Sequence, residues 1–388
     1  MSIKFPIYLD NNATTKLDPR VLEAMLPYFS EHYGNYSSKH KFGYEAHSAV
    51  ELAREQVAKM INAQPEEIFF TSGSTESINL AHIGFAIANQ HKGKHIISSE
   101  VEHSASYESL IFLSKSGFDI SFIKPDNYGR IDPEEVIKNV RKDTILISLI
   151  YANNEIGTVN DLYPIAQFCI NEKIAFHTDA TQAVGKMKVD VQSLNPFSMS
   201  FSAHKIYGPK GIGALFTNKN STKFNISPLF FGGNQENSLR SGTLNVPAIV
   251  GFGKSCDILF NEIEDDLKLY KKLNSHLLKK IVSHLNDIKL NGHPVERIFN
   301  NLNFTVNDVL SQDLISKTPE LAFSTGSACS SENIKKNRIL RAIGLNDKQI
   351  DSTFRIGIGR FNTLEEIEFA SEKLISQINL IREKSYKN

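Results

Sequence analysis

An alternation of strand-like and helix-like segments between about residues 68 and 216 constrains the fold of this chain more than any other feature. Short apolar runs typical of buried strands are separated by stretches in which apolar residues recur at helical spacing. Such alternation predicts an α/β architecture, with a mostly parallel sheet covered by helices on both faces. The seven expected strands lie at residues 68–70, 96–99, 120–123, 145–150, 174–177, 197–201 and 213–216.

The pattern changes after about Ser255. A long charged amphipathic segment runs to about Leu285, and strand-like pieces and a last helix from Leu364 follow it. This change predicts a second, smaller α+β domain. We expect a large domain over residues 16–255 and a small domain formed by residues 1–15 and 256–388.

Composition argues against several classes of protein. The chain has 43 basic and 43 acidic residues, so no strong positive charge indicates direct nucleic acid binding. Neither a signal peptide nor an apolar run long enough to cross a membrane is recognisable, and no histidine motif indicates a metal site. Three widely spaced cysteines without a C-x-x-C motif favour a reducing compartment. We therefore expect a cytoplasmic protein of enzyme size.

Lys205 follows one of the expected strands, within the stretch 202–211. Groups at the carboxyl ends of parallel strands face the ligands of α/β proteins. A lysine at such a place can form a Schiff base with an aldehyde cofactor. Most lysines are solvated surface charges, so this interpretation needs support from other residues.

Two further strand ends could supply that support. The turn that carries Ser74 and Thr75 opens a helix, whose free N–H groups and dipole attract a phosphate, although an ordinary capped turn explains the same stretch. Asp179 ends a buried strand, where a carboxylate needs a partner. A protonated pyridine nitrogen is such a partner, and a helix cap is the alternative.

Four other residues are candidates for binding or chemistry. His103 and Asn154 follow strand ends, where an imidazole can stack on a ring or exchange protons and an amide can face a ligand or a turn. Arg355 lies inside an apolar strand and needs a carboxylate or similar partner. Cys329 has small polar neighbours and nearby cations, which favour a thiolate nucleophile, whereas Cys169 lies in an apolar helix.

Together these motifs resemble the cysteine desulfurases of the NifS/IscS type, within the class V, fold-type I pyridoxal-phosphate enzymes. The likeness extends over nearly the whole chain. Its most specific parts are Ser-Ala-His-Lys at 202–205 and Gly-Ser-Ala-Cys at 326–329. The other matching motifs lie at 8–15, 71–77, 102–103, 153–157, 179–182, 240–243 and Arg355.

The resemblance implies that pyridoxal phosphate is bound covalently by Lys205. It also implies a homodimer, because Thr243 matches a position that reaches the phosphate of the neighbouring subunit. The residues implied to bind the phosphate within one chain are Ser74, Thr75, Ser202 and His204. Those implied at the ring are Asp179 at the pyridine nitrogen, Gln182 and Asn154 at the ring oxygen and His103 stacked on the ring.

The implied substrate is L-cysteine, whose carboxylate would be held by Arg355 and Asn35, with Asn154 close by. Lys205, freed from the cofactor, would remove the α-proton, and Cys329 would attack the sulfur to give a persulfide and alanine. The persulfide would then pass to an acceptor protein, in iron–sulfur cluster assembly or in tRNA or DNA thiolation.

Some features depart from the family pattern. Tyr36 stands where the family usually has proline, residues 292–301 match poorly, and the chain stops soon after the last expected helix, which leaves the acceptor open. A selenocysteine lyase or another class V enzyme is the alternative activity. A non-catalytic adaptor that kept the fold is the alternative from another class.

Overall fold

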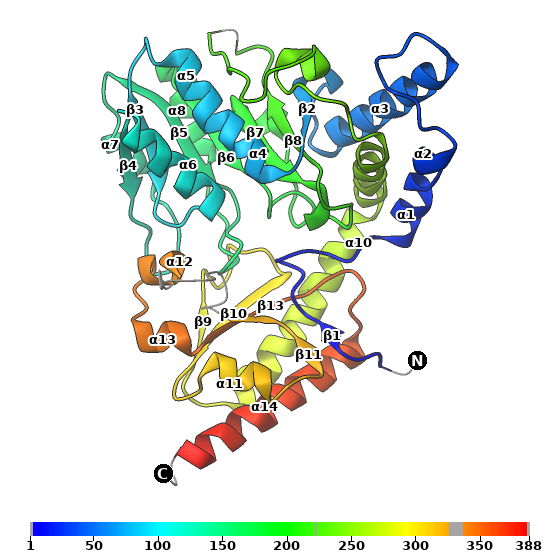
Figure 1. The fold of residues 1–388 in the computed structure, drawn as a ribbon. Coiled ribbons are helices and arrows are strands. Elements are labelled where there is room, and N and C mark those ends of the chain that lie inside the picture. The colour runs from blue at the N-terminus through cyan, green and yellow to red at the C-terminus, as the bar shows by residue number, and fades with distance from the viewer. Residues whose placement is uncertain (1–2, 222, 326–336, 386–388) are drawn as a thin grey trace.

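The fold is known from a computed structural model, which describes residues 3–221, 223–325 and 337–385. Its largest element is a sheet with the strand order β2-β8-β7-β6-β5-β3-β4 (Figure 1). In this sheet β8 is antiparallel to both neighbours, and the other pairs are parallel. The expected mostly parallel seven-stranded sheet is therefore confirmed. The strands are β2 (Ile68–Thr71), β3 (His95–Ser99), β4 (Asp119–Ile123), β5 (Thr144–Ile150), β6 (Ala175–Asp179), β7 (Ser198–Ser202) and β8 (Gly213–Thr217).

Helices flank this sheet and connect its strands (Figure 1). α1 begins with Asp18 as its cap, whose carboxylate accepts the Arg20 N–H, and Pro19 occupies the first helical position. The helices are α1 (Pro19–Met25), α2 (Pro27–Ser30), α3 (Lys41–Met60), α4 (Ser74–Asn79), α5 (Phe85–Asn89), α6 (Ser104–Lys115), α7 (Pro133–Lys138), α8 (Tyr163–Glu172) and α9 (Val191–Leu194). The shorter helical turns are η1 (Pro65–Glu67), η2 (Leu80–Gly84), η3 (Ala203–Lys205) and η4 (Gln235–Ser238).

A second, antiparallel sheet has the order β12-β13-β10-β9, and β1 pairs in parallel with β11 beside it (Figure 1). This smaller α+β part matches the expected character of the C-terminal region. Its strands are β1 (Ile7–Tyr8), β9 (Ile288–Asn291), β10 (Asn301–Val306), β11 (Leu321–Ala322), β12 (Ser324–Thr325) and β13 (Thr353–Gly357). The remaining helices are α10 (Val246–His284), α11 (Ser311–Ser316), α12 (Arg338–Ala342), α13 (Asp347–Asp351) and α14 (Leu364–Ser385).

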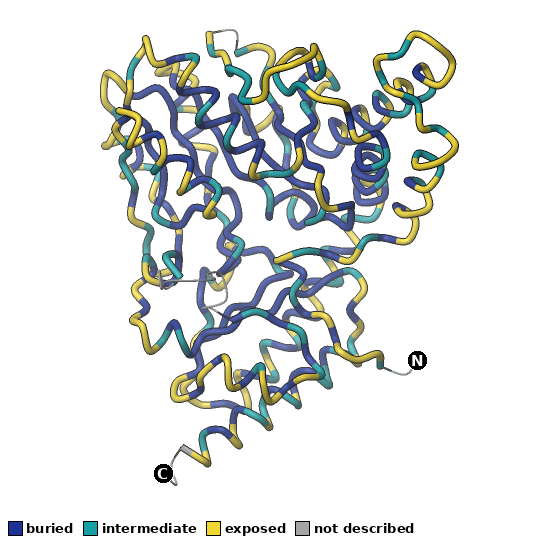
Figure 2. The backbone as a smooth tube through the Cα atoms, in the orientation of Figure 1, coloured by how far each residue is buried: buried dark blue, intermediate teal, exposed yellow. Residues whose placement is uncertain are grey.

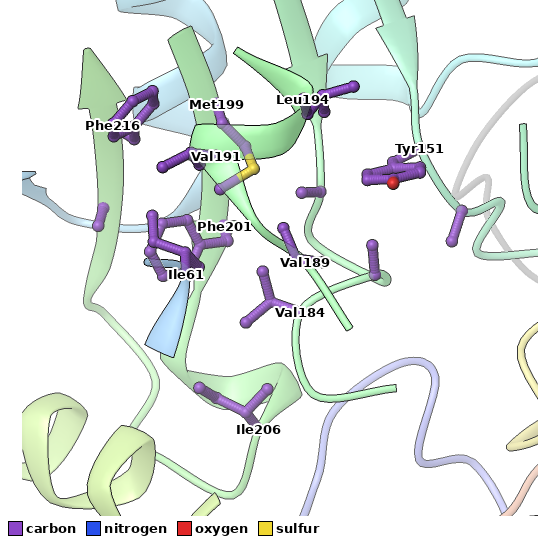
Figure 3. Close-up of a cluster of buried hydrophobic side chains, with 14 of the residues drawn as sticks. Ile61, Tyr151, Val184, Val189, Val191, Leu194, Met199, Phe201, Ile206 and Phe216 are labelled. Carbon is purple, nitrogen blue, oxygen red and sulfur yellow. The ribbon is translucent and has the colours of Figure 1, made fainter. Parts of the chain in front are cut away.

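Two large hydrophobic clusters form the interior, and the inner strands of both sheets are buried (Figure 2). Figure 3 shows part of the first cluster, which includes Met199 and Phe201 of β7 and Ile206, the residue after Lys205. The second cluster joins the small sheet to α14. Because α10 contributes to both clusters and runs across the expected boundary near residue 255, the division into residues 16–255 and the remainder stays a proposal.

No helix within the described ranges is long and apolar enough to cross a membrane.

Two fully buried histidines, His82 on η2 and His177 on β6, lie where η2 packs against the large sheet. The His82 ring bonds to the hydroxyls of Ser109 (2.8 Å) and Ser148 (2.7 Å), and the His177 Nδ1 lies 2.9 Å from the Ser198 hydroxyl. Their rings meet edge to face at 5.3 Å. Desolvation lowers the pKa of His82 to about 3 and the pKa of His177 well below its ordinary value. Both imidazoles are therefore neutral in the folded protein at neutral pH.

These histidines should make stability fall as the pH drops. Below about pH 6.5 the unfolded chain binds protons at both residues while the folded chain does not, so each lowers the free energy of unfolding by ~1.4 kcal/mol per pH unit. For His82 this loss continues to about pH 3, where the folded form also becomes protonated. Urea unfolding at fixed protein concentration should show a shallower acid slope for His82→Asn than for the parent. Parallel slopes would contradict the assignment.

Candidate functional site

A cavity of about 540 Å³ opens where β5, β6 and β7 end, at Ile150, Asp179 and Ser202. The carboxyl ends of parallel strands are the usual ligand side of an α/β sheet. Most residues singled out from the sequence line this one cavity. They are Ser74, Thr75, His103, Asn154, Asp179, Gln182, Ser202, His204, Lys205 and Arg355.

Lys205 lies in the turn η3, directly after β7. The buried Ile206 anchors this turn in the core, while the Lys205 ammonium donates to the main-chain carbonyls of Asn12 (2.8 Å) and Ala13 (2.7 Å). A second lysine, Lys186, is buried beneath the turn and donates to the Lys205 carbonyl at 3.2 Å. Burial, and then the charge of Lys205, lower the pKa of Lys186 to about 7.

One end of the cavity suits an anion. Gly73 has a φ of +150°, and a side chain there would point toward the Ser202 hydroxyl, 3.9 Å from an added Cβ. The turn thus leaves open space between β7 and the start of α4, where the Thr181 hydroxyl donates to the Ser74 hydroxyl at 2.7 Å. Desolvation and the charges of Lys205, Lys186 and Lys210 lower the pKa of His204 to about 4, which marks an electropositive environment.

The middle of the cavity holds polar groups that the described chain does not satisfy. The Gln182 Oε1, the Asn154 Oδ1 and both polar side-chain atoms of Asn12 are buried without a hydrogen-bond partner among the described residues. Asp179 is also buried, and its Oδ1 accepts the Thr181 N–H at 2.9 Å. Because unsatisfied buried polar groups are costly, this arrangement fits a ligand with several polar atoms.

His103 lies on the cavity wall as the cap of α6, with its Nδ1 accepting the Ala105 N–H at 3.1 Å. Desolvation is the main cause of its lowered pKa, and Lys205 and Arg338 lower it further while Asp179 opposes them. The imidazole is thus favoured in its neutral form. A neutral ring can lie against an aromatic ligand without bringing a charge into the cavity.

The neighbouring Glu102 is buried, and desolvation raises its pKa to about 8. Its Oε1 accepts the Ser99 hydroxyl (2.6 Å) and the Ile150 N–H (2.9 Å). At neutral pH this carboxyl group is mostly protonated. It therefore joins the ends of β3 and β5 without placing a second negative charge near Asp179.

Arg355 enters the cavity from the small sheet, on β13. The sequence predicted a carboxylate partner for Arg355, and the structure has two. The Arg355 Nη2 lies 3.0 Å from the Asp10 Oδ1, and the Arg355 Nη1 lies 3.2 Å from the Glu155 Oε2. The Arg355 Nη2 also donates to the Ser324 hydroxyl at 3.2 Å. A guanidinium held by two carboxylates has a fixed direction, which suits recognition of a further carboxylate at the cavity.

Two of the predicted site residues, Asn35 and Thr243, do not line this cavity. The Asn35 Oδ1 accepts the N–H (3.0 Å) and the hydroxyl (2.8 Å) of Ser37, outside the lining. Thr243 is exposed and also outside the lining. Cys329 lies outside the described residues, and Cys169 is buried with its pKa raised to about 12 by desolvation. The roles of Asn35, Thr243 and Cys329 stay predictions.

The cavity also contains residues to which no role was given from the sequence. Asn12 supplies a main-chain carbonyl to both Lys205 and Gln182, and Thr181 and Lys210 belong to the lining. The only sequence sign of Asn12 and Thr181 was their position inside the matching motifs 8–15 and 179–182. Asn12 acts through its main-chain carbonyl, and Thr181 contacts Ser74, which is distant in sequence.

The model of the aminotransferase class-V family matches residues 7–369 of the chain. The chain belongs to the class-V aminotransferase family. A cysteine desulfurase IscS from Neisseria meningitidis is 45% identical over 386 residues, which cover 99% of this chain and 95% of the relative.

Solved structures agree with this assignment. A NifS-like protein has a TM-score of 0.90 and 34% identity, with 97% of this chain and 100% of that chain covered. SspA in complex with cysteine has a TM-score of 0.82 and 32% identity, with 92% and 99% covered. The expected family, the fold-type I architecture and pyridoxal phosphate as the cofactor are thereby confirmed.

The carboxylate of Asp179 should matter for cofactor affinity because of its charge. Asp179→Asn keeps the size of the side chain and an acceptor for the Thr181 N–H, but it removes the negative charge. Since a hydrogen bond to a charged group contributes ~1.5–3 kcal/mol, we expect affinity for pyridoxal phosphate to fall about tenfold or more. Titration of the apoprotein, followed by visible absorption, measures this change. Asp161→Asn, an exposed site outside the cavity, is the control, and equal affinities for the two variants would contradict the role.

Proposed function

We propose that this chain removes sulfur from L-cysteine, giving L-alanine and a persulfide on Cys329. The relatives confirm the predicted activity, a pyridoxal-phosphate-dependent cysteine desulfurase, and do not favour a selenocysteine lyase. The observation that supports the site assignment most strongly is that Lys205, Asp179, His103 and Arg355 line one cavity beside an anion-binding turn. An adaptor without catalysis would not need this combination.

The residues of the cavity fit pyridoxal phosphate. Bound there, the cofactor supplies an electron sink for the electron pair released at the substrate α-carbon. Asp179 would hold the charged pyridine nitrogen, His103 would lie against the ring, and Lys205 would hold the cofactor covalently. Gln182 and Asn154 would bind the ring oxygen through their amide nitrogens, while their unsatisfied amide oxygens would accept from donors of the ligand. The proposed phosphate ligands are Ser74, Thr75, Ser202 and His204, with Thr243 from a second subunit.

Other residues would bind and orient L-cysteine. Arg355, fixed by Asp10 and Glu155, would bind the substrate carboxylate, and Asn35 is a second proposed contact. Lys205 would carry the α-proton on its Nζ once its amine is free. The main-chain carbonyls of Asn12 and Ala13 accept hydrogen bonds from the Lys205 amine, and these bonds would keep the free amine at the cavity.

The thiolate of Cys329 would attack the sulfur of the substrate. A sulfur–sulfur bond forms as the carbon–sulfur bond breaks, and the electron pair of that bond remains with the three-carbon fragment. This fragment would take up one proton at its β-carbon, regain one at its α-carbon and leave as alanine, while the transferred sulfur stays on Cys329 as a persulfide. A cysteine with a stabilised thiolate is the nucleophile that this step requires.

The persulfide would then pass to an acceptor protein, in iron–sulfur cluster assembly or in tRNA or DNA thiolation. The name of the Neisseria relative, IscS, makes cluster assembly the first acceptor system to test. A reducing compartment such as the cytoplasm suits a reactive thiol that must return to its reduced form after each transfer.

We also propose that the enzyme acts as a homodimer. The helices α1, α2 and α3 expose several large apolar side chains, and exposed segments of these helices can be followed in Figure 2. Phe231, which is 85% exposed, precedes the segment of Thr243, and the Arg54–Glu236 ion pair (2.8 Å) attaches this loop to α3. A second copy that covered these residues would bury apolar surface. Thr243 of one copy would then lie toward the cavity of the other copy. The exposed apolar residues of the three helices are Leu22, Leu26, Phe29, Phe42, Tyr44 and Leu52.

Replacement of Cys329 should separate the cofactor from the sulfur chemistry. Cys329→Ala removes the proposed nucleophile, so sulfide release from L-cysteine should be abolished while the colour of the bound cofactor remains. Absorption spectra and a sulfide assay measure both properties, and Cys169→Ala is the matched control. Unimpaired desulfuration in Cys329→Ala would disprove the persulfide mechanism. A colourless protein that does not respond to pyridoxal phosphate would instead favour the adaptor.

The oligomeric state tests the dimer. Sedimentation should give twice the mass of one chain, and Phe231→Glu should weaken association because it would bury a charge in the interface. Val295→Glu alters an exposed apolar residue away from these helices and should leave the mass unchanged. A monomeric parent, or equal association of both variants, would contradict the proposed interface.

A further inference from the structure

The strand β10 is buried over its whole length, although every second residue in it is polar. The apolar half of its sequence, Asn-Leu-Asn-Phe-Thr-Val, lies in the second hydrophobic cluster. Because successive side chains of a strand point to opposite faces, Asn301, Asn303 and Thr305 share the other face of the small sheet. A buried amide or hydroxyl costs free energy unless it is hydrogen-bonded, so this face needs polar partners outside the cluster.

Some of these partners form a row across the small sheet. Asn303 pairs in register with Asn291 of β9 on one side and with Arg355 of β13 on the other, and Ser324 of β12 lies opposite Arg355. The Asn291 Nδ2 donates to the Asn303 Oδ1 and to the Thr305 hydroxyl, both at 2.8 Å. With its oxygen engaged by Asn291, the Asn303 amide has its nitrogen left to donate to other acceptors.

Glu155 supplies those acceptors. The Asn303 Nδ2 donates to the Glu155 Oε1 at 3.0 Å and to the Glu155 main-chain carbonyl at 3.1 Å. The other carboxylate oxygen of Glu155 accepts from the Arg355 Nη1 at 3.2 Å. Burial raises the pKa of Glu155, whereas the charge of Arg355 and the hydrogen bonds of Asn337 and Asn303 lower it. The bond from Asn303 therefore favours the charged carboxylate, which is the form that pairs with Arg355.

The main chain of Glu155 is also held by other residues. The Asn301 Nδ2 donates to the Glu155 carbonyl at 3.3 Å, and the Asn153 Oδ1 accepts the Glu155 N–H at 2.9 Å. Of Asn153, Asn301 and Asn303, the last is the one that also contacts the carboxylate. Loss of the Asn303 amide should therefore leave the loop attached and release one oxygen of the Glu155 side chain.

We propose that Asn303 is a positioning residue for recognition of the substrate carboxylate. It holds Glu155 in the orientation that fixes the Arg355 guanidinium, and Asn291 fixes Asn303 in turn. Binding of a ligand that carries a carboxylate therefore depends on Asn303, whereas binding of the cofactor and of amines without a carboxylate does not. This inference rests on the proposed role of Arg355 in binding that carboxylate.

Two ligands that differ only in a carboxylate test this dependence. L-alanine, the proposed product, and ethylamine share the amine and its two-carbon chain. Titration of the holoenzyme, followed by the absorption of the cofactor, measures the affinity for each. For Asn303→Ala we expect the affinity for L-alanine to fall on the order of tenfold, because residues of one buried network are strongly coupled, while ethylamine binds as in the parent. Equal effects on the two ligands, or no effect on L-alanine, would overturn the proposal.

Steady-state kinetics give a second measurement. The KM for L-cysteine should rise by a similar factor in Asn303→Ala, with little change in kcat at saturating substrate. Asn89→Ala is the matched control, since it also removes a fully buried amide, which donates to the carbonyls of Phe85 and Asn225 outside the cavity lining. This control should keep the affinities and KM of the parent, even if it unfolds at a lower temperature. A fall in kcat with an unchanged KM in Asn303→Ala would contradict a role in carboxylate recognition.

Further variants keep the test decisive if Asn303→Ala does not fold. Asn303→Asp keeps the size of the side chain and an acceptor for Asn291, but it places an oxygen where the donor to Glu155 was. It should therefore also bind L-alanine less tightly than the parent. The double variant Asn303→Asp/Glu155→Gln should lose no more affinity than Glu155→Gln, because Asn303 acts through that carboxylate. Parent-like affinity in Asn303→Asp, or additive losses in the double variant, would overturn the inference.

Arg355→Ala distinguishes the two levels of the argument. It should weaken binding of L-alanine and leave binding of ethylamine unchanged. If it affects both ligands alike, the proposed role of Arg355 itself fails. If Arg355→Ala weakens only L-alanine while the Asn303 variants resemble the parent, only the positioning role of Asn303 fails.

Discussion

The buried ion-pair cluster around Arg355 is the constraint on which the rest of the site depends. A guanidinium taken out of water without partners costs several kcal/mol, so its two carboxylates must be brought to it. Asp10 follows β1, Glu155 follows β5 of the large sheet, and Arg355 lies on β13 of the small one. The charge of Arg355 is paired only where these three segments meet. They meet at the wall of the cavity. The same meeting brings the main chain of Asn12 to Lys205.

Much of the fold could be predicted from the apolar pattern, because buried strands of a parallel sheet are continuous apolar runs. All seven expected strands are present in the large sheet. The direction of β8 could not be predicted, since the run at 213–216 has the same composition whether it pairs in parallel or antiparallel. The long amphipathic segment expected after about Ser255 is part of a helix that already begins at Val246, because Asn245 caps it and Pro247 is tolerated in its first turn.

The site could be predicted where chemistry is carried by side chains at strand ends. Asp179 ends β6, while His103 and Lys205 follow β3 and β7, and parallel strands bring such ends to one edge. The contribution of Asn12 could not be predicted, because a main-chain carbonyl leaves no trace in the residue type. The contacts of Arg338 could not be predicted either. Its guanidinium donates to the main-chain carbonyls of Glu100 and Glu102, which are distant in sequence.

The length of α10 has a consequence for the molecule as a whole. Its 39 residues extend about 58 Å at 1.5 Å per residue, with one half packed in the first hydrophobic cluster and the other in the second. Neither cluster can lose its packing without exposing the apolar stripe of a helix that the other also needs. The packing of the two clusters is therefore linked, because residues of one continuous helix are buried in both.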